Sequence, residues 1–353
     1  MKTVKVVGCG GYGGMGIVEL LLRHPEAKLQ TLVAATETGG KMGEMYPHLA
    51  GFCDLPIWAP DAPEAQEPAD IVFFSTPDGV GQRGAAAELA KGAKVVDYSG
   101  DFRFDNEADY AEYARRLGKD PVHKAPELLK ETVYGLPEIN RKAYREGQRL
   151  VGNPGCFAVS CLLGSAPAVA AGLVEEGSLI FDCKTGVSGA GKKPSAGHHY
   201  PARYDNMNAY RLKGHQHVME IERRLADFNG GRMQAVTMTA QVVPVCRGIM
   251  TCVYGQLKAG VGLEAVQEAY REFYKGERFV RLYGPVSGVG TAHVRGSNYA
   301  NLIVDADLRT GRLRVVSHID NLVKGQAGNA LQNMNILCGF PEGLGLDGPG
   351  AYP

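Results

Sequence analysis

Short apolar segments alternate with amphipathic stretches through the first half of the chain. The segments at 4–7, 29–35, 70–77 and 94–98 are rich in Val, Ile, Leu and Phe, a composition typical of parallel strands buried on both faces. The stretches at 17–23 and 85–90 have helical character and follow the first and third of these strands. This alternation predicts an α/β domain with a Rossmann-type parallel sheet.

The second half has a different pattern. Apolar and polar residues alternate over 178–185, 233–240 and 250–257, and further strands are expected near 300–306 and 313–318. A helix is expected at about 263–275. Together, these strands and this helix predict an α+β domain with a mostly antiparallel sheet. We therefore expect a dinucleotide-binding domain at 1–155, joined by a C-terminal helix at about 321–353, and a substrate domain at 156–320.

Composition narrows the class of protein. Lys plus Arg and Asp plus Glu both number 38, so nothing predicts a basic surface for nucleic acid. No run approaches the roughly 18 apolar residues of a membrane span, and a strand at the N-terminus argues against a signal peptide. The eight cysteines include no Cys-x-x-Cys pair, which argues against a zinc ribbon. Scattered thiols in a chain of this size favour a cytoplasmic protein.

A glycine-rich loop follows the first strand and precedes the first helix. That context makes a dinucleotide fingerprint credible, because glycines let the backbone approach a pyrophosphate at the helix N-terminus. The third strand becomes polar at its end, where open α/β sheets bind ligands. The resulting candidate cofactor residues are Gly8, Gly10, Gly11, Tyr12, Gly13, Thr36, Thr38, Ser75 and Pro77.

The end of the second strand gives conflicting signals about the cofactor. Glu37 would suit the 2′-hydroxyl of NAD, whereas the flanking Thr36 and Thr38, with Lys41 nearby, would suit the 2′-phosphate of NADP. Both cofactors remain open on these residues.

The turn Gly152-Asn153-Pro154-Gly155 leads from a strand directly to Cys156 and an apolar helix at 157–171. A thiol at a helix N-terminus feels the positive end of the helix dipole, which favours the thiolate. Cys156 is therefore a candidate nucleophile. The alternative is a small buried apolar residue, as many free cysteines are.

A second group of candidate residues precedes a helix expected to begin near His217. His215 and His217 share a face only in extended backbone, so one can act on a thiol while the other is held elsewhere. His-x-His-x-x-Glu, ending at Glu220, also permits a metal site, but no Cys or Asp lies nearby at ligand spacing, and no metal is expected.

Arg103 follows the fourth strand, where it can bind an anion or form a surface ion pair with Asp101 or Asp105.

Seven motifs in order give the chain a specific resemblance. It resembles the N-acetyl-gamma-glutamyl-phosphate reductase family of the aspartate-semialdehyde dehydrogenase superfamily over about residues 3–346. The motifs are Gly152-Asn153-Pro154-Gly155-Cys156, Ser99-Gly100-Asp101-Phe102-Arg103, Tyr134-Gly135-Leu136-Pro137-Glu138, Gly186-Val187-Ser188-Gly189-Ala190-Gly191, Gly214-His215-Gln216-His217 with Glu220, Gly296-Ser297-Asn298 and Asp320-Asn321-Leu322-Val323-Lys324-Gly325.

The resemblance implies an oxidoreductase of arginine biosynthesis that reduces an acyl phosphate with NADPH. The Cys156 thiolate would displace phosphate and form a thioester, which hydride reduces to a semialdehyde. His215 and His217 would supply acid/base chemistry, with Glu220 orienting His215. The resemblance further implies a homo-oligomer that forms through the second domain. It assigns Asn321 and Gly325 to the cofactor, Tyr210 to the site, and the substrate to Arg103, Ser188, Gly189, Ala190, Asn206 and Lys324.

The sequence departs from the family pattern at the cofactor site. Family members usually carry Ser and Thr in the first glycine loop, and this chain has only glycines, Cys9 and Tyr12 there. Glu37 is also unusual, so NADP is expected but NAD is not excluded. The alternatives are a lysine-pathway aminoadipyl-phosphate reductase, which would need a basic rim for an acidic carrier protein, aspartate-semialdehyde dehydrogenase itself, and a non-catalytic dinucleotide sensor.

Overall fold

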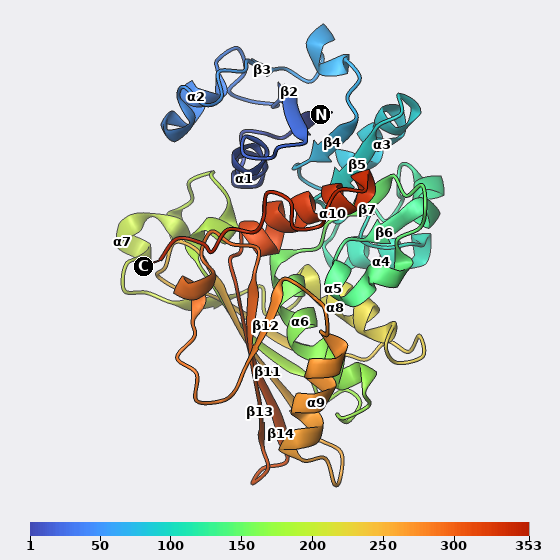
Figure 1. Ribbon diagram of the computed structural model, residues 1–353, viewed down its shortest axis with the longest axis vertical. Coiled ribbons are helices and arrows are strands. Elements are labelled where there is room, and N and C mark those ends of the chain that lie inside the picture. The colour runs from blue at the N-terminus through green and yellow to red at the C-terminus, as the bar shows by residue number, and fades with distance from the viewer. Residues whose placement is uncertain (353) are drawn as a thin grey trace. The chain divides into compact units, whose positions relative to one another are not determined.

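The computed structural model describes residues 1–352 and divides into two compact units (Figure 1). Unit 1 comprises residues 1–114, 120–155 and 326–348. Unit 2 comprises residues 115–119, 156–325 and those from 349 onward. Among residues 1–352, none of the helices has both the length and the apolar content needed to span a lipid bilayer.

Unit 1 is built on a seven-stranded sheet in the order β3-β2-β1-β4-β5-β7-β6, and all its pairings are parallel. Its strands are β1 (Lys2–Val7), β2 (Ala27–Val33), β3 (Ile57–Trp58), β4 (Ile71–Phe74), β5 (Lys94–Asp97), β6 (Thr132–Tyr134) and β7 (Leu150–Gly152). The helices of this part of the chain are α1 (Tyr12–Leu21), α2 (Met42–Met45), α3 (Gly81–Ala90), α4 (Glu107–Arg116), α5 (Pro137–Asn140) and α10 (Gly328–Cys338). Every residue of β4 is buried, as a central parallel strand requires.

Unit 2 contains a seven-stranded mixed sheet in the order β12-β13-β14-β11-β8-β10-β9. Only β12–β13 and β10–β8 pair in parallel, so the sheet is mostly antiparallel. Its strands are β8 (Ile180–Thr185), β9 (Asn208–Tyr210), β10 (Thr237–Val242), β11 (Ile249–Gln256), β12 (Val280–Tyr283), β13 (Ala300–Asp307) and β14 (Arg312–Ile319). The helices are α6 (Cys156–Ala170), α7 (Tyr200–Arg203), α8 (His217–Ala226) and α9 (Leu263–Phe273).

Helix α6 forms the core of unit 2. It packs against β11, β14, α8 and α9, and residues 157–168 are all buried. Pro167 interrupts the helical hydrogen bonding because it has no N–H to offer the carbonyl of Leu163. The hydroxyl of Tyr274 donates to that carbonyl oxygen at 2.6 Å and thereby replaces the missing partner.

The predicted fold class is confirmed, since a parallel-sheet domain of Rossmann type precedes a mostly antiparallel one. Several element boundaries were wrong. Residues 233–236 are not in a strand, and β10 starts at Thr237. In the motif at 134–138, Tyr134 ends β6 and Pro137 begins α5.

The C-terminal helix is shorter than predicted. A π-helical turn occupies Val323–Ala327, and α10 then runs only from Gly328 to Cys338. Gly339 ends α10 in the left-handed conformation, at φ 70°, which glycine adopts without strain.

Candidate functional site

Cys156 is the first residue of α6 and lines a cavity of about 510 Å³ in unit 2. No acidic residue lies in the first turn of α6, so the helix dipole acts on the thiol without a competing negative side chain there. The thiol is half-buried. A cysteine so placed is accessible to a small electrophile and is favoured as a thiolate.

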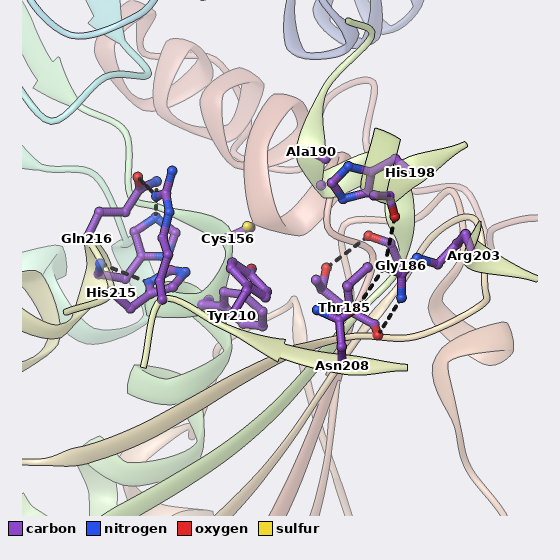
Figure 2. Close-up of a pocket in the computed structure, with 16 residues that line it drawn as sticks. Cys156, Thr185, Gly186, Ala190, His198, Arg203, Asn208, Tyr210, His215 and Gln216 are labelled. Carbon is purple, nitrogen blue, oxygen red and sulfur yellow. Dashed lines mark hydrogen bonds between the residues drawn. The ribbon is translucent and has the colours of Figure 1, made fainter. Parts of the chain in front are cut away.

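The two predicted histidines line the same cavity. Their rings lie 4.9 Å apart between centroids. The ring of Phe157, directly after Cys156, lies 5.4 Å from that of His215 and 6.2 Å from that of His217. Figure 2 shows His215 to one side of Cys156 and Tyr210 beside the thiol. The structure thus brings the histidine pair to the start of α6.

The start of α8 determines how His215 is held. The backbone N–H of His217 donates to Nδ1 of His215 at 3.2 Å. This contact satisfies an amide that the helix N-terminus otherwise leaves without a partner. Burial and the charge of Arg211 lower the pKa of His215 to about 4, so its imidazole is neutral near pH 7. Glu220 lies fully buried in α8.

Tyr210 ends β9 and also lines the cavity. Its ring lies 5.6 Å from that of His215. Burial, with a smaller contribution from the negative charge of Cys156, raises the pKa of the Tyr210 hydroxyl. The hydroxyl is therefore a hydrogen-bond donor in the site at neutral pH.

A buried cation lies on the opposite side of the cavity from His215 (Figure 2). The guanidinium of Arg203 donates to the carbonyl oxygens of Gly197 and Asn206, both at 2.9 Å, and to Oδ1 of Asn208 at 2.7 Å. These acceptors are neutral, so the positive charge is not cancelled by a carboxylate. The charge favours anions in the cavity.

Only some of the predicted substrate residues of unit 2 line the cavity. Gly189 and Ala190 line the cavity. Ser188 is buried beneath the turn they form, where its Oγ accepts a hydrogen bond from Nδ2 of Asn321 at 3.0 Å. Asn206 is exposed and donates to the carbonyl of Ala202 at 3.0 Å. Ser188, Asn206 and Lys324 are absent from the cavity lining within residues 1–352.

Asn321 and Lys324 occupy buried positions in the turn after β14. Oδ1 of Asn321 accepts from the backbone N–H of Gly248 at 2.7 Å. With its bond to Ser188, this side chain ties the 187–190 turn to the start of β11. Lys324 is fully buried, with Nζ 5.7 Å above the ring of Phe279.

Gly325 lies against the nucleophile candidate. A Cβ added there would be 2.8 Å from Cβ of Cys156 and 3.3 Å from the carbonyl oxygen of Asp320. Only glycine allows this approach, and it occurs within the π-helical turn, a feature that is frequent at functional sites.

In unit 1, the turn that precedes Cys156 is strongly constrained. The Asn153 side chain donates to the carbonyl of Gln326 at 3.1 Å and accepts from Nδ2 of Asn329 at 2.9 Å. Arg103 is buried. It donates to the carbonyls of Asn153 at 3.0 Å and Tyr98 at 2.6 Å.

The glycine loop of unit 1 forms an open backbone cradle. Gly8 has φ 88°, and a Cβ there would lie 2.2 Å from the carbonyl oxygen of Ser75. Gly11 precedes α1 with no side chain capping the helix, and at both Gly10 and Gly11 an added Cβ has no neighbour nearer than 3.6 Å. The first amides of α1 are thus available to a phosphate, and the loop fits a dinucleotide.

The other cofactor candidates of this unit differ in burial. Gly13 packs closely, since a Cβ there would be 2.7 Å from both Oγ of Ser75 and Nε2 of Gln326. Tyr12 and Ser75 are half-buried, whereas Thr36, Thr38 and Pro77 are exposed.

Sequence reasoning missed several residues of the cavity: Thr185, His198, Arg203, Asn208 and Arg211. Four of these five lie between residues 198 and 211, a polar segment without periodicity. Its only regular elements are one-turn helices and the three residues of β9. Their one local signal is the density of Arg, His and Asn residues in that segment.

Comparisons with known proteins agree with this architecture. Residues 3–147 match the NAD binding domain of semialdehyde dehydrogenase, and residues 156–321 match its dimerisation domain. A solved structure, aspartate semialdehyde dehydrogenase II from Vibrio cholerae, has a TM-score of 0.70 at 17% identity and covers 96% of this chain and 98% of its own. That identity supports the fold alone.

Two sequence relatives are much closer. Proteins named N-acetyl-gamma-glutamyl-phosphate reductase from Pelotomaculum thermopropionicum and Symbiobacterium thermophilum are 42% and 44% identical to this chain, each alignment covering 99% of both chains. Identity at this level over the full length shows that the chain belongs to the N-acetyl-gamma-glutamyl-phosphate reductase family.

Proposed function

We propose that the protein reduces N-acetyl-gamma-glutamyl phosphate to N-acetylglutamate semialdehyde with NADPH and releases phosphate, as a step of arginine biosynthesis. The observation that carries the proposal is Cys156 at the open N-terminus of α6, in a cavity shared with His215 and His217. The named relatives support the substrate. They do not favour the lysine-pathway reductase, aspartate-semialdehyde dehydrogenase or the sensor.

In the proposed mechanism the Cys156 thiolate attacks the γ-carbonyl carbon. The carbon–oxygen bond to phosphate breaks, phosphate leaves, and a thioester remains on Sγ. Arg203 and the α6 N-terminus stabilise the thiolate and attract the anionic substrate. Gly189 and Ala190 present backbone groups to the substrate. When bound, the nicotinamide supplies the hydride that reduces the thioester.

The remaining predicted residues fit supporting roles in this scheme. Gly8, Gly10, Gly11 and Gly13 would hold the pyrophosphate, and Asn321 with Gly325 would shape the wall beside the thiol. We also retain Arg103, Ser188, Asn206, Lys324, Tyr12, Ser75, Pro77, His217 and Glu220 as site residues.

We propose NADP as the cofactor. Thr36 and Thr38 are exposed after β2 and offer two hydroxyl donors to a 2′-phosphate. Glu37 between them is exposed and in the left-handed conformation at φ 57°. Replacing Glu37 with Ser should leave the ratio of kcat/KM for NADPH over NADH unchanged if the carboxylate points away, and raise it if the carboxylate faces the ribose. A preference for NADH in the unmodified protein contradicts NADP.

The decisive experiment is phosphate-dependent oxidation of N-acetylglutamate semialdehyde. The unmodified protein should reduce NADP⁺ only when phosphate and the semialdehyde are both present. Cys156→Ser should lower turnover more than about a thousandfold, because the thioester intermediate forms on the thiol of Cys156. More than a tenth of the activity remaining in that variant is incompatible with the thioester.

We further propose a cytoplasmic homo-oligomer. All eight cysteines are thiols, with no disulfide among residues 1–352, as in a reducing compartment. On β8 and β11 the side chains alternate between buried residues and partly exposed ones such as Ile180, Met250 and Tyr254. This sheet face is suited to a second copy, and light scattering should give a native mass of at least two chains.

A further inference from the structure

The imidazole of His215 is held in one tautomer by the start of α8. The backbone N–H of His217 donates to Nδ1 of His215 at 3.2 Å. A backbone amide can only donate, so Nδ1 must offer its lone pair. In a neutral ring the proton is then on Nε2, which lies on the far side of the ring from the α8 amide.

The surroundings of His215 keep the ring neutral. Only 8% of the residue is exposed. The groups around it are the rings of Phe157, Tyr210 and His217 and the charge of Arg211. Cys156 lines the same cavity. No carboxylate bonds to it in the described residues, and the positive N-terminus of α8 opposes a second proton. Burial and Arg211 lower its pKa to about 4.

We propose that His215 acts as a neutral hydrogen-bond donor, through Nε2–H, to the acyl oxygen of the substrate at Cys156, and not as the base that removes the thiol proton. The proposal rests on the proposed function, because it requires the Cys156 thioester. It distinguishes His215 from His217, whose backbone fixes the tautomer.

Atoms and charges balance without a proton from His215. The thiolate sulfur bonds to the carbonyl carbon, and the C=O electron pair moves onto oxygen, where Nε2–H stabilises it. The pair then returns, the bond to the phosphate oxygen breaks, and phosphate takes its proton from water. His215 keeps its proton throughout, as expected of a donor aimed at developing negative charge.

The opposite tautomer is disfavoured by the same contact. A His215 that accepted the thiol proton on Nε2 would first carry its own proton on Nδ1. Two N–H groups would then face each other across 3.2 Å, and the first amide of α8 would lose its acceptor. A thiolate favoured by the N-terminus of α6 makes such a base unnecessary.

The tautomer can be measured directly on the full-length, unmodified protein. Two-bond ¹H–¹⁵N correlation spectra should show His215 with a protonated Nε2 and an unprotonated Nδ1 between pH 6 and 8. Comparison with His215→Gln assigns the resonance. A protonated Nδ1, or a titration midpoint above about 6, overturns the proposal whether or not any variant folds.

Activity provides the second test. Gln places an amide N–H near the position of Nε2 but cannot act as a base, whereas Ala offers neither. His215→Gln should retain kcat within about tenfold of the unmodified protein, and His215→Ala should lose about 10²–10³-fold, the usual effect of removing one such donor. Equal losses in the two variants overturn the donor role.

Alkylation separates this proposal from the proposed function. The pH dependence of iodoacetamide labelling, followed by mass spectrometry of the peptide that contains Cys156, reports the thiol pKa. It should be the same in His215→Ala as in the unmodified protein, and an increase of more than about one unit identifies His215 as the base. Undiminished turnover in Cys156→Ser would instead reject the thioester, while the tautomer measurement would stand.

Discussion

Replacing Gly325 with Ala tests whether the π-helical turn positions the nucleophile. The new Cβ would lie 2.8 Å from Cβ of Cys156 and 3.3 Å from its Cα. Real Cβ contacts are essentially never shorter than 3.0 Å, and ordinary contacts begin at 3.4 Å. The two groups must therefore separate by at least 0.2 Å (3.0 − 2.8), and by 0.6 Å (3.4 − 2.8) to reach an ordinary contact. Because α6 is buried along its length, the displacement falls on the thiol or on the turn.

The expected cost has two parts. Overpacking of this kind destabilises a folded protein by about 1–3 kcal/mol, which we expect as a modest fall in the unfolding midpoint. A misplacement of about 1 Å at a reacting group costs on the order of 10²-fold in rate. We therefore expect Gly325→Ala to lower kcat about ten- to a hundredfold in the phosphate-dependent assay, with Cys156 labelling by iodoacetamide also slowed.

Gly164→Ala is the matched control. Its added Cβ would also come within 2.8 Å of a side-chain atom, Cγ2 of Val253, but it lies two turns along α6 from Cys156. It should alter stability by a similar amount while kcat stays within about threefold. If Gly325→Ala keeps more than half of the unmodified kcat, or if both variants lose activity equally, the turn does not position the thiol.

Two further predictions, one for the core of each unit, can be tested by urea unfolding. Tyr274→Phe should destabilise unit 2 by about 1–3 kcal/mol, because the Leu163 carbonyl loses the hydroxyl that compensates for Pro167. Tyr270→Phe is the control. It removes a hydrogen bond to a carbonyl that also has an amide partner four residues on, so it should lower the free energy of unfolding by less. In unit 1, burial raises the pKa of Asp97 to about 8 from 3.8. Between about pH 4 and 8 the unfolded chain loses this proton while the folded carboxyl keeps it, so the free energy of unfolding falls as pH rises through that window. Asp97→Asn should flatten the fall, and an unchanged slope would show that Asp97 is not its source.

The parts of this molecule that sequence predicted are those where local pattern and tertiary role coincide. Strand β4 is apolar throughout because both its faces are buried. The glycine loop could be predicted because only glycine permits φ 88° at Gly8 so close to Ser75. The turn before Cys156 could also be predicted from local sequence, since Asn-Pro-Gly restricts the backbone on its own. Elsewhere the local pattern was misleading. Residues 233–236 alternate like a strand but are not paired, because β10 pairs with β8 only from Thr237 onward.

The parts that sequence missed depend on contacts between distant segments. Arg203 resembles any surface arginine in a polar segment, and its burial follows only from carbonyls that the folded loop and β10 bring around it. The π-helical turn at Val323–Ala327 was predicted only as part of one continuous helix. His215 is the clearest case. Its spacing from His217 indicated that one of the two acts on the thiol, but not which one. In the structure the amide of His217 donates to Nδ1 of His215. The two imidazoles therefore have different hydrogen-bond partners because one backbone N–H starts a helix, a distinction that residue identities alone do not contain.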